Sequence, residues 1–142
     1  FTIGFTKKSA RQFFTLLQTE GVRRLVDVRL NNASQLAGFA KKNDLAYFLE
    51  VLCGIDYIHL PQWAPDKDLL EQYKKKKTDF STYAKTYQAL LKQRNMEKTG
   101  IGRILDKDCL LCSEHEPKFC HRRLAAEYIQ TIRPDMTIVH LQ

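Results

Sequence analysis

The sequence predicts a three-layer α/β domain, in which a mainly parallel five-stranded sheet has helices on both faces. Short apolar segments rich in β-branched residues alternate along the chain with segments whose apolar residues recur at helical spacing. Strands that alternate with helices form parallel sheets, as in Rossmann-like folds. The chain has 142 residues and no repeat or linker, so we expect residues 1–142 to fold as a single domain.

Five segments are expected to form the strands. They are residues 2–5, 23–30, 57–60, 109–112 and 136–141. The second, RRLVDVRL, is β-branched at its centre, which is typical of a strand buried in a sheet.

Helix signals lie between the first three strands. Ser9 and Gln12 have the spacing of a capping box, and Gly21 suits the left-handed position just past a helix end. After a long loop over residues 31–42, Asn43 or Asp44 is expected to cap a second helix.

The second half of the chain contains the longer helical regions. The second helix is expected to end at Gly54, and residues 65–98 are mostly helical and polar. Lys74 to Lys77 fall at a helix end, where positive charge complements the helix dipole. The last helix is expected from about Cys120 to Arg133.

Charge and cysteine content indicate the partners and the compartment. The formal net charge of +7 favours a small anionic or phosphorylated ligand, or nucleic acid, although a solvated basic surface explains it equally. No apolar run is long enough for a bilayer, so no membrane partner is expected. The chain starts without a secretory pattern and without Met, and it can lack residues at either end. We expect a cytoplasmic protein with free thiols.

The segment from Cys109 to Arg123, CLLCSEHEPKFCHRR, holds three of the four cysteines and two of the four histidines. Cys120 is expected at the start of the last helix, where backbone N–H groups and Arg122 would favour a thiolate or bind an anion. Cys112, on a strand-to-loop turn, is an equal candidate nucleophile. The alternative for both is a buried, inert thiol. Cys109 should face away from Cys112 into the core.

Polar groups from separate segments should meet at the carboxyl edge of a parallel sheet, where such sheets bind ligands. Thr6, Asp27, Arg29, Cys112 and Glu114 each lie at or just after the end of an expected strand. Asp27 and Arg29 are two residues apart, so their side chains share one face of the strand. They are expected either to orient a substrate or to form a structural ion pair.

A zinc site and several known catalytic loops fit the spacing poorly. Cys109 and Cys112 have the spacing of zinc ligands but should face opposite sides of a strand, so no metal or other cofactor is expected. The chain has no Gly-rich phosphate loop and no Cys-x₅-Arg phosphatase loop. LVDVR, followed later by strand, cysteine, loop and helix, resembles the layout of rhodanese-like sulfurtransferases. The loop CSEHEPKFCHRR is longer and lacks the glycine of that family's active loop.

A closer resemblance covers almost the whole chain. TIGFT, LVDVR with the following Asn-Ala-Ser, GIDYIHLP and LLCSEHEPKFCHRRLAAEYI occur in the order found in the bacterial domain of unknown function 488 family. The most specific part is Cys112 and Glu114 followed by Cys120, His121 and Arg122. Asn31 and Asn32 replace the proline usual after DVR, and Gln62-Trp63-Ala64 replaces a glycine-bearing turn. The resemblance implies a compact α/β domain with a shared polar site.

Three hypotheses for the function follow. The first is an enzyme acting on a phosphorylated or nucleic-acid-derived substrate. The residues expected to bind the substrate are Thr6, Asp27, Arg29 and Arg122. Glu114 or His121 would transfer protons, and Cys112 and Cys120 would lie in the site. The second is a non-catalytic module that binds nucleic acid or a protein, and the third is thiol-dependent chemistry by Cys112 or Cys120.

Overall fold

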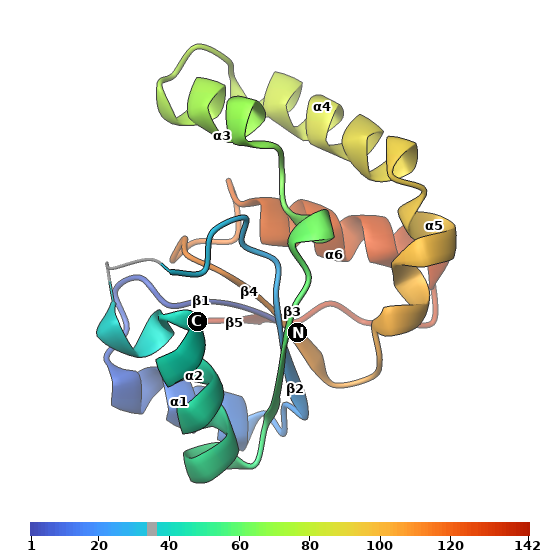
Figure 1. Cartoon of the computed structure of the whole chain (residues 1–142). Helices are drawn as coiled ribbons and strands as arrows, with labels where there is room; N and C mark the ends of the chain where they lie inside the picture. Colours follow the sequence, from blue (N-terminus) through green and yellow to red (C-terminus); the bar gives the residue numbers. More distant parts are fainter. Residues whose placement is uncertain (34–36) are drawn as a thin grey trace.

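The computed structural model of the protein describes residues 1–33 and 37–142 and contains a five-stranded parallel sheet (Figure 1). Every paired strand is parallel to its neighbour, and the order across the sheet is β3-β2-β4-β1-β5. The strands are β1 (Thr2–Gly4), β2 (Arg24–Asp27), β3 (Asp56–His59), β4 (Asp108–Cys112) and β5 (His140–Leu141). The predicted five-stranded α/β fold is confirmed.

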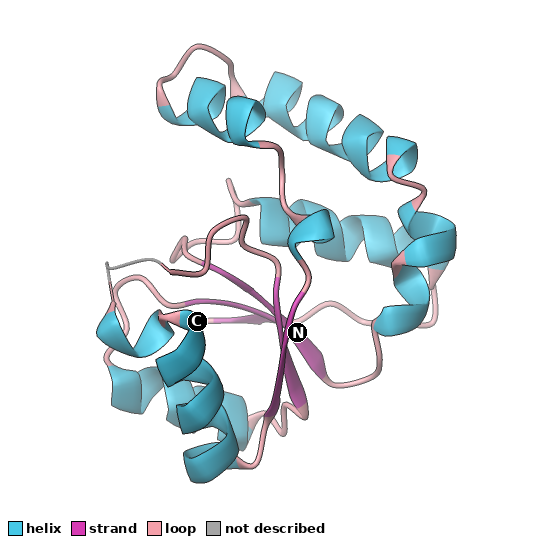
Figure 2. Ribbon diagram, in the orientation of Figure 1, coloured by secondary structure: helices cyan, strands magenta, loops and turns pink. Residues whose placement is uncertain are grey.

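Helices cover both faces of the sheet, which gives the three predicted layers (Figure 2). One face carries α1 (Ala10–Thr19) and α2 (Lys42–Phe48), and the latter continues as a π-helical turn over Leu49–Cys53. The opposite face carries α3 (Lys67–Lys74), α4 (Phe80–Gln93), α5 (Met96–Thr99) and α6 (His121–Ile132). None of the helices in the described part of the chain combines the length and apolarity that a membrane span requires.

The alternation of side chains along the strands separates the core into two clusters. Leu25, Cys109 and Leu111 pack against α1 and α2, whereas Val26 and Leu110 pack against α4 and α6. Both faces of the central strands are therefore buried, as expected for a parallel sheet covered by helices.

Three strands are shorter than predicted, β1 by a single residue and β2 and β5 by more. β2 ends at Asp27 instead of residue 30 because the Asp27 carboxylate accepts the backbone N–H of Arg29, which turns the chain out of the sheet. β5 covers only His140–Leu141 because it lies at the edge and pairs with Thr2 and Ile3 alone. The middle of the predicted loop, residues 34–36, lies outside the described residues.

The helix ends show which local signals were sufficient. The Ser9–Gln12 capping box forms as predicted, and Gly21 and Gly54 take the left-handed conformation with φ of 67° and 62°. The predicted cap at Asn43 or Asp44 is wrong: α2 begins at Lys42, and both residues lie within its first turn. The carboxylate of Asp44, in the first turn, interacts favourably with the positive end of the helix dipole, but it does not cap the helix.

The strand order places a crevice between β2 and β4. The chain leaves β2 across the α1–α2 face toward β3, and leaves β4 through α6 on the other face toward β5. Neighbouring strands whose connections depart to opposite faces leave an opening at their carboxyl ends, where open α/β sheets bind ligands. The loops after β2 and β4 form the sides of this opening.

Gly4, at the end of β1, is packed directly against the loop after β4. A Cβ atom at Gly4 would lie 1.7 Å from the carbonyl oxygen of Glu114 and 3.0 Å from Nη1 of Arg122. We expect Gly4→Ala to lower the free energy of unfolding by at least about 3 kcal/mol, measured by urea denaturation, because neither neighbour is free to move. Gly102→Ala, where no atom lies within 4 Å of the new Cβ, is the matched control. Equal stability of the two variants would contradict the close packing.

Candidate functional site

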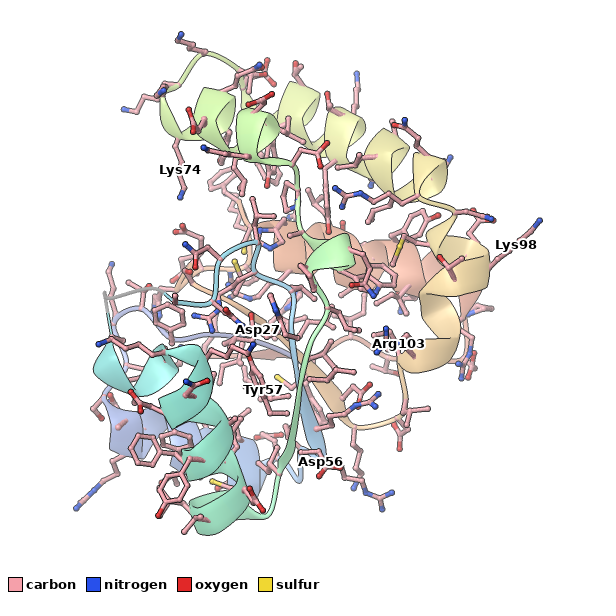
Figure 3. The ribbon with its side chains drawn as sticks, viewed as in Figure 1. Asp27, Asp56, Tyr57, Lys74, Lys98 and Arg103 are labelled. Carbon is pink, nitrogen blue, oxygen red and sulfur yellow. The ribbon has the colours of Figure 1, made fainter. Side chains whose placement is uncertain are left out.

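A cavity of about 580 Å³ opens at the carboxyl edge of the sheet, beside β2 and β4. Its walls come from three regions that are distant in sequence: the loop after β2, the loop after β4 with the start of α6, and the α3–α4 pair. In Figure 3, Lys74 extends from α3 toward the loops at this edge. The residues that line it are Arg29, Leu30, Asn31, Lys67, Leu70, Glu71, Tyr73, Lys74, Tyr83, Cys112, Ser113, Glu114, Phe119, Cys120 and His121.

Two cysteine sulfurs meet at the inner end of this cavity. Cys112 is the last residue of β4, and Cys120 is the N-cap residue of α6 in an extended conformation. Cys112 Sγ, Cys120 Sγ and a ring nitrogen of His121 all lie within 4.8 Å of one another, so the two thiols are close enough to interact. All four cysteines of the chain are free thiols, as predicted.

The surroundings shift the pKa values of the two thiols in opposite directions. The neighbouring Cys120 thiol lowers the pKa of Cys112 below its ordinary value although burial opposes this, and Arg122 and the backbone N–H groups of Ser113 and Glu114 add to the effect. The proximity of Cys112, together with burial, raises the pKa of Cys120 well above its ordinary value. Of the two sulfurs, Cys112 is therefore the more readily ionised.

His121 connects the two sides of the crevice. Its Nε2 lies 3.1 Å from the backbone oxygen of Val28, and its Nδ1 lies 3.6 Å from Cys112 Sγ. A carbonyl oxygen only accepts hydrogen bonds, so this contact assigns the ring proton to Nε2 and leaves the lone pair of Nδ1 toward Cys112. His121 is therefore placed to accept the proton of the Cys112 thiol.

The same three side chains have the composition of a metal site. One ligand atom from each of Cys112, Cys120 and His121 lies within 4.8 Å of the other two, and such a set suits thiophilic ions such as Zn²⁺. Cys109, the partner considered from sequence spacing, lies on the opposite face of the sheet in the core, and burial raises its pKa to about 12. Of the two cysteines with zinc-ligand spacing, only Cys112 takes part, and it is joined by Cys120 and His121.

Asp27 and Arg29 form a buried ion pair that braces the loop after β2. Nε and Nη2 of Arg29 donate to the two oxygens of Asp27 at 2.8 and 2.7 Å, and the Tyr57 hydroxyl donates to the same carboxylate at 2.7 Å. Burial by itself would lower the pKa of Arg29, but the contacts with Asp27 raise it overall. Arg29 Nη2 also donates to the carbonyl of Ala40 at 3.0 Å, which ties this loop to the segment before α2.

The ion pair lies on the other face of the sheet from the two cysteines. Asp27 follows Leu25 on the α1–α2 face, and the Arg29 guanidinium lies 5.2 Å from the centre of the Phe5 ring on that side. Cys112 follows Leu110 on the α4–α6 face. The predicted shared face of Asp27 and Arg29 is confirmed, and Asp27 does not line the cavity.

Thr6 and Arg122 also make internal contacts. The hydroxyl and the backbone N–H of Thr6 both donate to the carbonyl of Ser113. The fully buried Arg122 guanidinium donates to the carbonyls of Glu114 and His115. Neither residue lines the cavity, so a direct contact of either one with a substrate stays a prediction.

The structure thus brings together Arg29, Cys112, Glu114, Cys120 and His121 from the predicted site. The sequence reasoning did not include the α3 side chains Lys67, Tyr73 and Lys74. Lys67 and Lys74 are two helical turns apart and therefore lie on one side of α3. The spacing of the two lysines could have indicated that they act together. It does not show that α3 lies over the cavity.

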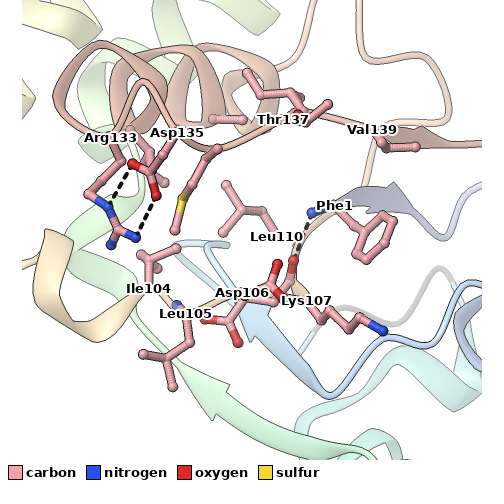
Figure 4. Close-up of a pocket in the computed structure, with 15 residues that line it drawn as sticks. Phe1, Ile104, Leu105, Asp106, Lys107, Leu110, Arg133, Asp135, Thr137 and Val139 are labelled. Carbon is pink, nitrogen blue, oxygen red and sulfur yellow. Dashed lines mark hydrogen bonds and ion pairs between the residues drawn. The ribbon is translucent and has the colours of Figure 1, made fainter.

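A second cavity of about 490 Å³ lies at the opposite edge of the sheet (Figure 4). Its lining is largely apolar, with Ile104, Leu110 and Ile129 among the residues, and an Arg133–Asp135 ion pair stands beside it. None of the predicted site residues lines this cavity. The candidate site is therefore the cavity at the carboxyl edge.

Fold and site together define a three-layer α/β domain with a cysteine pair and a histidine at the carboxyl edge of its sheet. The family model for the domain of unknown function DUF488 matches residues 9–129, so the chain belongs to the DUF488 family, as the sequence motifs indicated. Comparison with curated proteins finds no match. Comparison with solved structures finds none either.

The environment of Arg29 predicts a structural role that Glu114 does not share. Arg29→Ala leaves the Asp27 carboxylate buried without its partner, so we expect a loss of about 3–5 kcal/mol in the free energy of unfolding. Glu114→Ala removes an exposed side chain and should change stability by less than about 0.5 kcal/mol. Chemical denaturation of both variants measures this, and an unchanged stability of Arg29→Ala would contradict the bracing role.

Proposed function

We propose that this protein is a thiol-dependent enzyme in which Cys112 attacks an electrophilic substrate bound in the 580 Å³ cavity. The observation that carries the proposal is the position of Cys112 in the lining of the cavity, with Cys120 Sγ and a ring nitrogen of His121 within 4.8 Å of its sulfur. Cys109, three residues earlier on the same strand, shows the contrast: it lies in an apolar core and its pKa is raised. Cys112 is itself only 4 % exposed, but it lines the cavity and has His121 Nδ1 at 3.6 Å from its sulfur, which Cys109 does not.

Each neighbour of Cys112 has a role in this proposal. Nδ1 of His121 takes the Cys112 proton, and its ring is held by the Val28 carbonyl. The N–H groups of Ser113 and Glu114 stabilise negative charge on the sulfur. Four free thiols fit a protein of a reducing compartment such as the cytoplasm.

The charges around the cavity favour an anionic substrate. In the described part of the chain, the ion pair on α3 joins Lys75 to Glu71 and leaves Lys67 and Lys74 without an acidic partner. Both lysines line the cavity, whereas the guanidinium of Arg29 is already neutralised by Asp27. We therefore assign the binding of a small anionic or phosphorylated group to the α3 lysines.

Alkylation rates test the nucleophile. We expect iodoacetamide at pH 7 to label Cys112 more than about tenfold faster than Cys53, because a lowered pKa gives a larger thiolate fraction at that pH. In Cys120→Ala the main cause of the lowered pKa is lost, so the rise of the labelling rate with pH should move to higher pH. Mass spectrometry of quenched samples follows each site. Labelling of Cys112 no faster than that of Cys53 would favour a non-catalytic module.

The charge of the alkylating reagent tests the role of α3. Lys74→Glu should lower the rate of Cys112 labelling by anionic iodoacetate, relative to neutral iodoacetamide, by about two- to fivefold at low salt. Lys98→Glu makes the same change of net charge at the far end of the helical layer (Figure 3) and should leave the ratio unchanged. A similar effect of both variants would show that only the overall charge matters.

A further inference from the structure

We propose that Cys112 and Cys120 reduce organic hydroperoxides, with Cys112 as the attacking sulfur and Cys120 as the resolving sulfur of a disulfide. This inference rests on the proposed function, since it names the substrate class of the same nucleophile. It goes further in giving the second cysteine a chemical step of its own.

The geometry pairs these two cysteines and separates the other two. The ligating atoms of Cys112, Cys120 and His121 all lie within 4.8 Å of one another, so the two sulfurs are neighbours. Cys120 precedes the first turn of α6, and its side chain makes no capping hydrogen bond, so its thiol can turn toward Cys112 without unwinding the helix. Cys109 lies across the sheet, and Cys53 ends the π-helical turn after α2.

A second thiol distinguishes this chemistry from acyl or phosphoryl transfer, in which one nucleophile suffices. A hydroperoxide oxidises a thiolate to a sulfenic acid, and a neighbouring thiol then converts the sulfenic acid to a disulfide. Because Cys120 Sγ lies within 4.8 Å of Cys112 Sγ, a second thiol is present where the sulfenic acid would form.

The atoms and charges of the reaction balance with the groups present. The Cys112 thiolate attacks the terminal oxygen of the hydroperoxide, the O–O bond breaks, and the leaving alkoxide takes the proton of Cys120. The Cys120 thiolate then attacks the sulfur of the Cys112 sulfenic acid, the S–S bond forms, and hydroxide leaves and takes one proton from solvent. The products are the disulfide, an alcohol and water, and a dithiol reductant restores both thiols.

The cavity favours an organic hydroperoxide over hydrogen peroxide. Its volume of about 580 Å³ is far larger than one peroxide group, and aromatic and aliphatic side chains line the part beside α3 and α4. Tyr73 and Tyr83 are stacked with ring centres 4.5 Å apart, and Phe119 lines the same cavity. These surfaces suit the apolar part of an organic hydroperoxide, and Lys67 and Lys74 suit an anionic group on it. The two sulfurs face its peroxide group.

One equivalent of cumene hydroperoxide, added to the reduced full chain in the presence of a chelator, tests the pair. We expect two of the four thiols to be lost and a disulfide to join Cys112 to Cys120. Trypsin cuts after Lys107, Lys118 and Arg122, so the two residues lie in different peptides whose cross-link is visible by mass spectrometry. Fragmentation distinguishes Cys112 from Cys109 in the same peptide. A disulfide that uses Cys53 or Cys109, or an unchanged thiol count, would overturn the proposal.

Variants in which one cysteine is replaced separate the oxidation of Cys112 from the formation of the disulfide. Cys120→Ala should stop at a Cys112 sulfenic acid, trapped by dimedone, with no disulfide, and Cys53→Ala should react as the unchanged protein does. Cumene hydroperoxide should react at least tenfold faster than hydrogen peroxide, and equal rates would overturn the organic substrate class. Rapid alkylation of Cys112 without peroxide-driven disulfide formation would reject this inference and leave the proposed function standing, whereas slow alkylation would reject both.

Discussion

The site depends on one buried cation, the guanidinium of Arg122. Two of its nitrogens donate to the carbonyls of Glu114 and His115, so the loop after β4 is folded around a side chain from the first turn of α6. A buried guanidinium needs such acceptors because no water is available to it. This requirement fixes the loop relative to the helix. Cys112, at the start of the loop, and Cys120, at the start of the helix, are thereby held with their sulfurs within 4.8 Å of each other.

The two faces of the sheet carry different sets of polar groups at its carboxyl edge. On the α1–α2 side, Asp27, Arg29 and Tyr57 form a closed polar network that holds the loop after β2. On the α4–α6 side, Cys112 and His121 remain at the cavity. The two sides are joined where His121 donates to the carbonyl of Val28. The polar network on one side of the sheet thus holds the loop whose Val28 carbonyl contacts the His121 ring on the other side.

Several local signals were sufficient, although the predicted cap at Asn43 or Asp44 was not. Alternation along a strand predicted that Cys109 would be in the core, and the capping box of Ser9 and Gln12 formed as expected. The meeting of the strand ends could also be predicted, because it needs only a parallel sheet. The strand order and the position of α3 over the cavity could not, since they depend on packing between distant segments. For the same reason, the sequence did not predict that Arg122 would donate to the carbonyls of Glu114 and His115.

The contact between His121 and Val28 joins residues that are 93 positions apart in the chain. Such a contact forms only after β2 and β4 have paired and α6 has docked on them, which places it among the slowly formed, non-local contacts of the fold. Before that stage the chain carries four cysteines without the neighbours that favour a thiolate on Cys112. The grouping of Cys112 with Cys120 and His121 therefore exists only in the completed fold, whereas an unfolded chain exposes all four thiols, three of which the native fold buries.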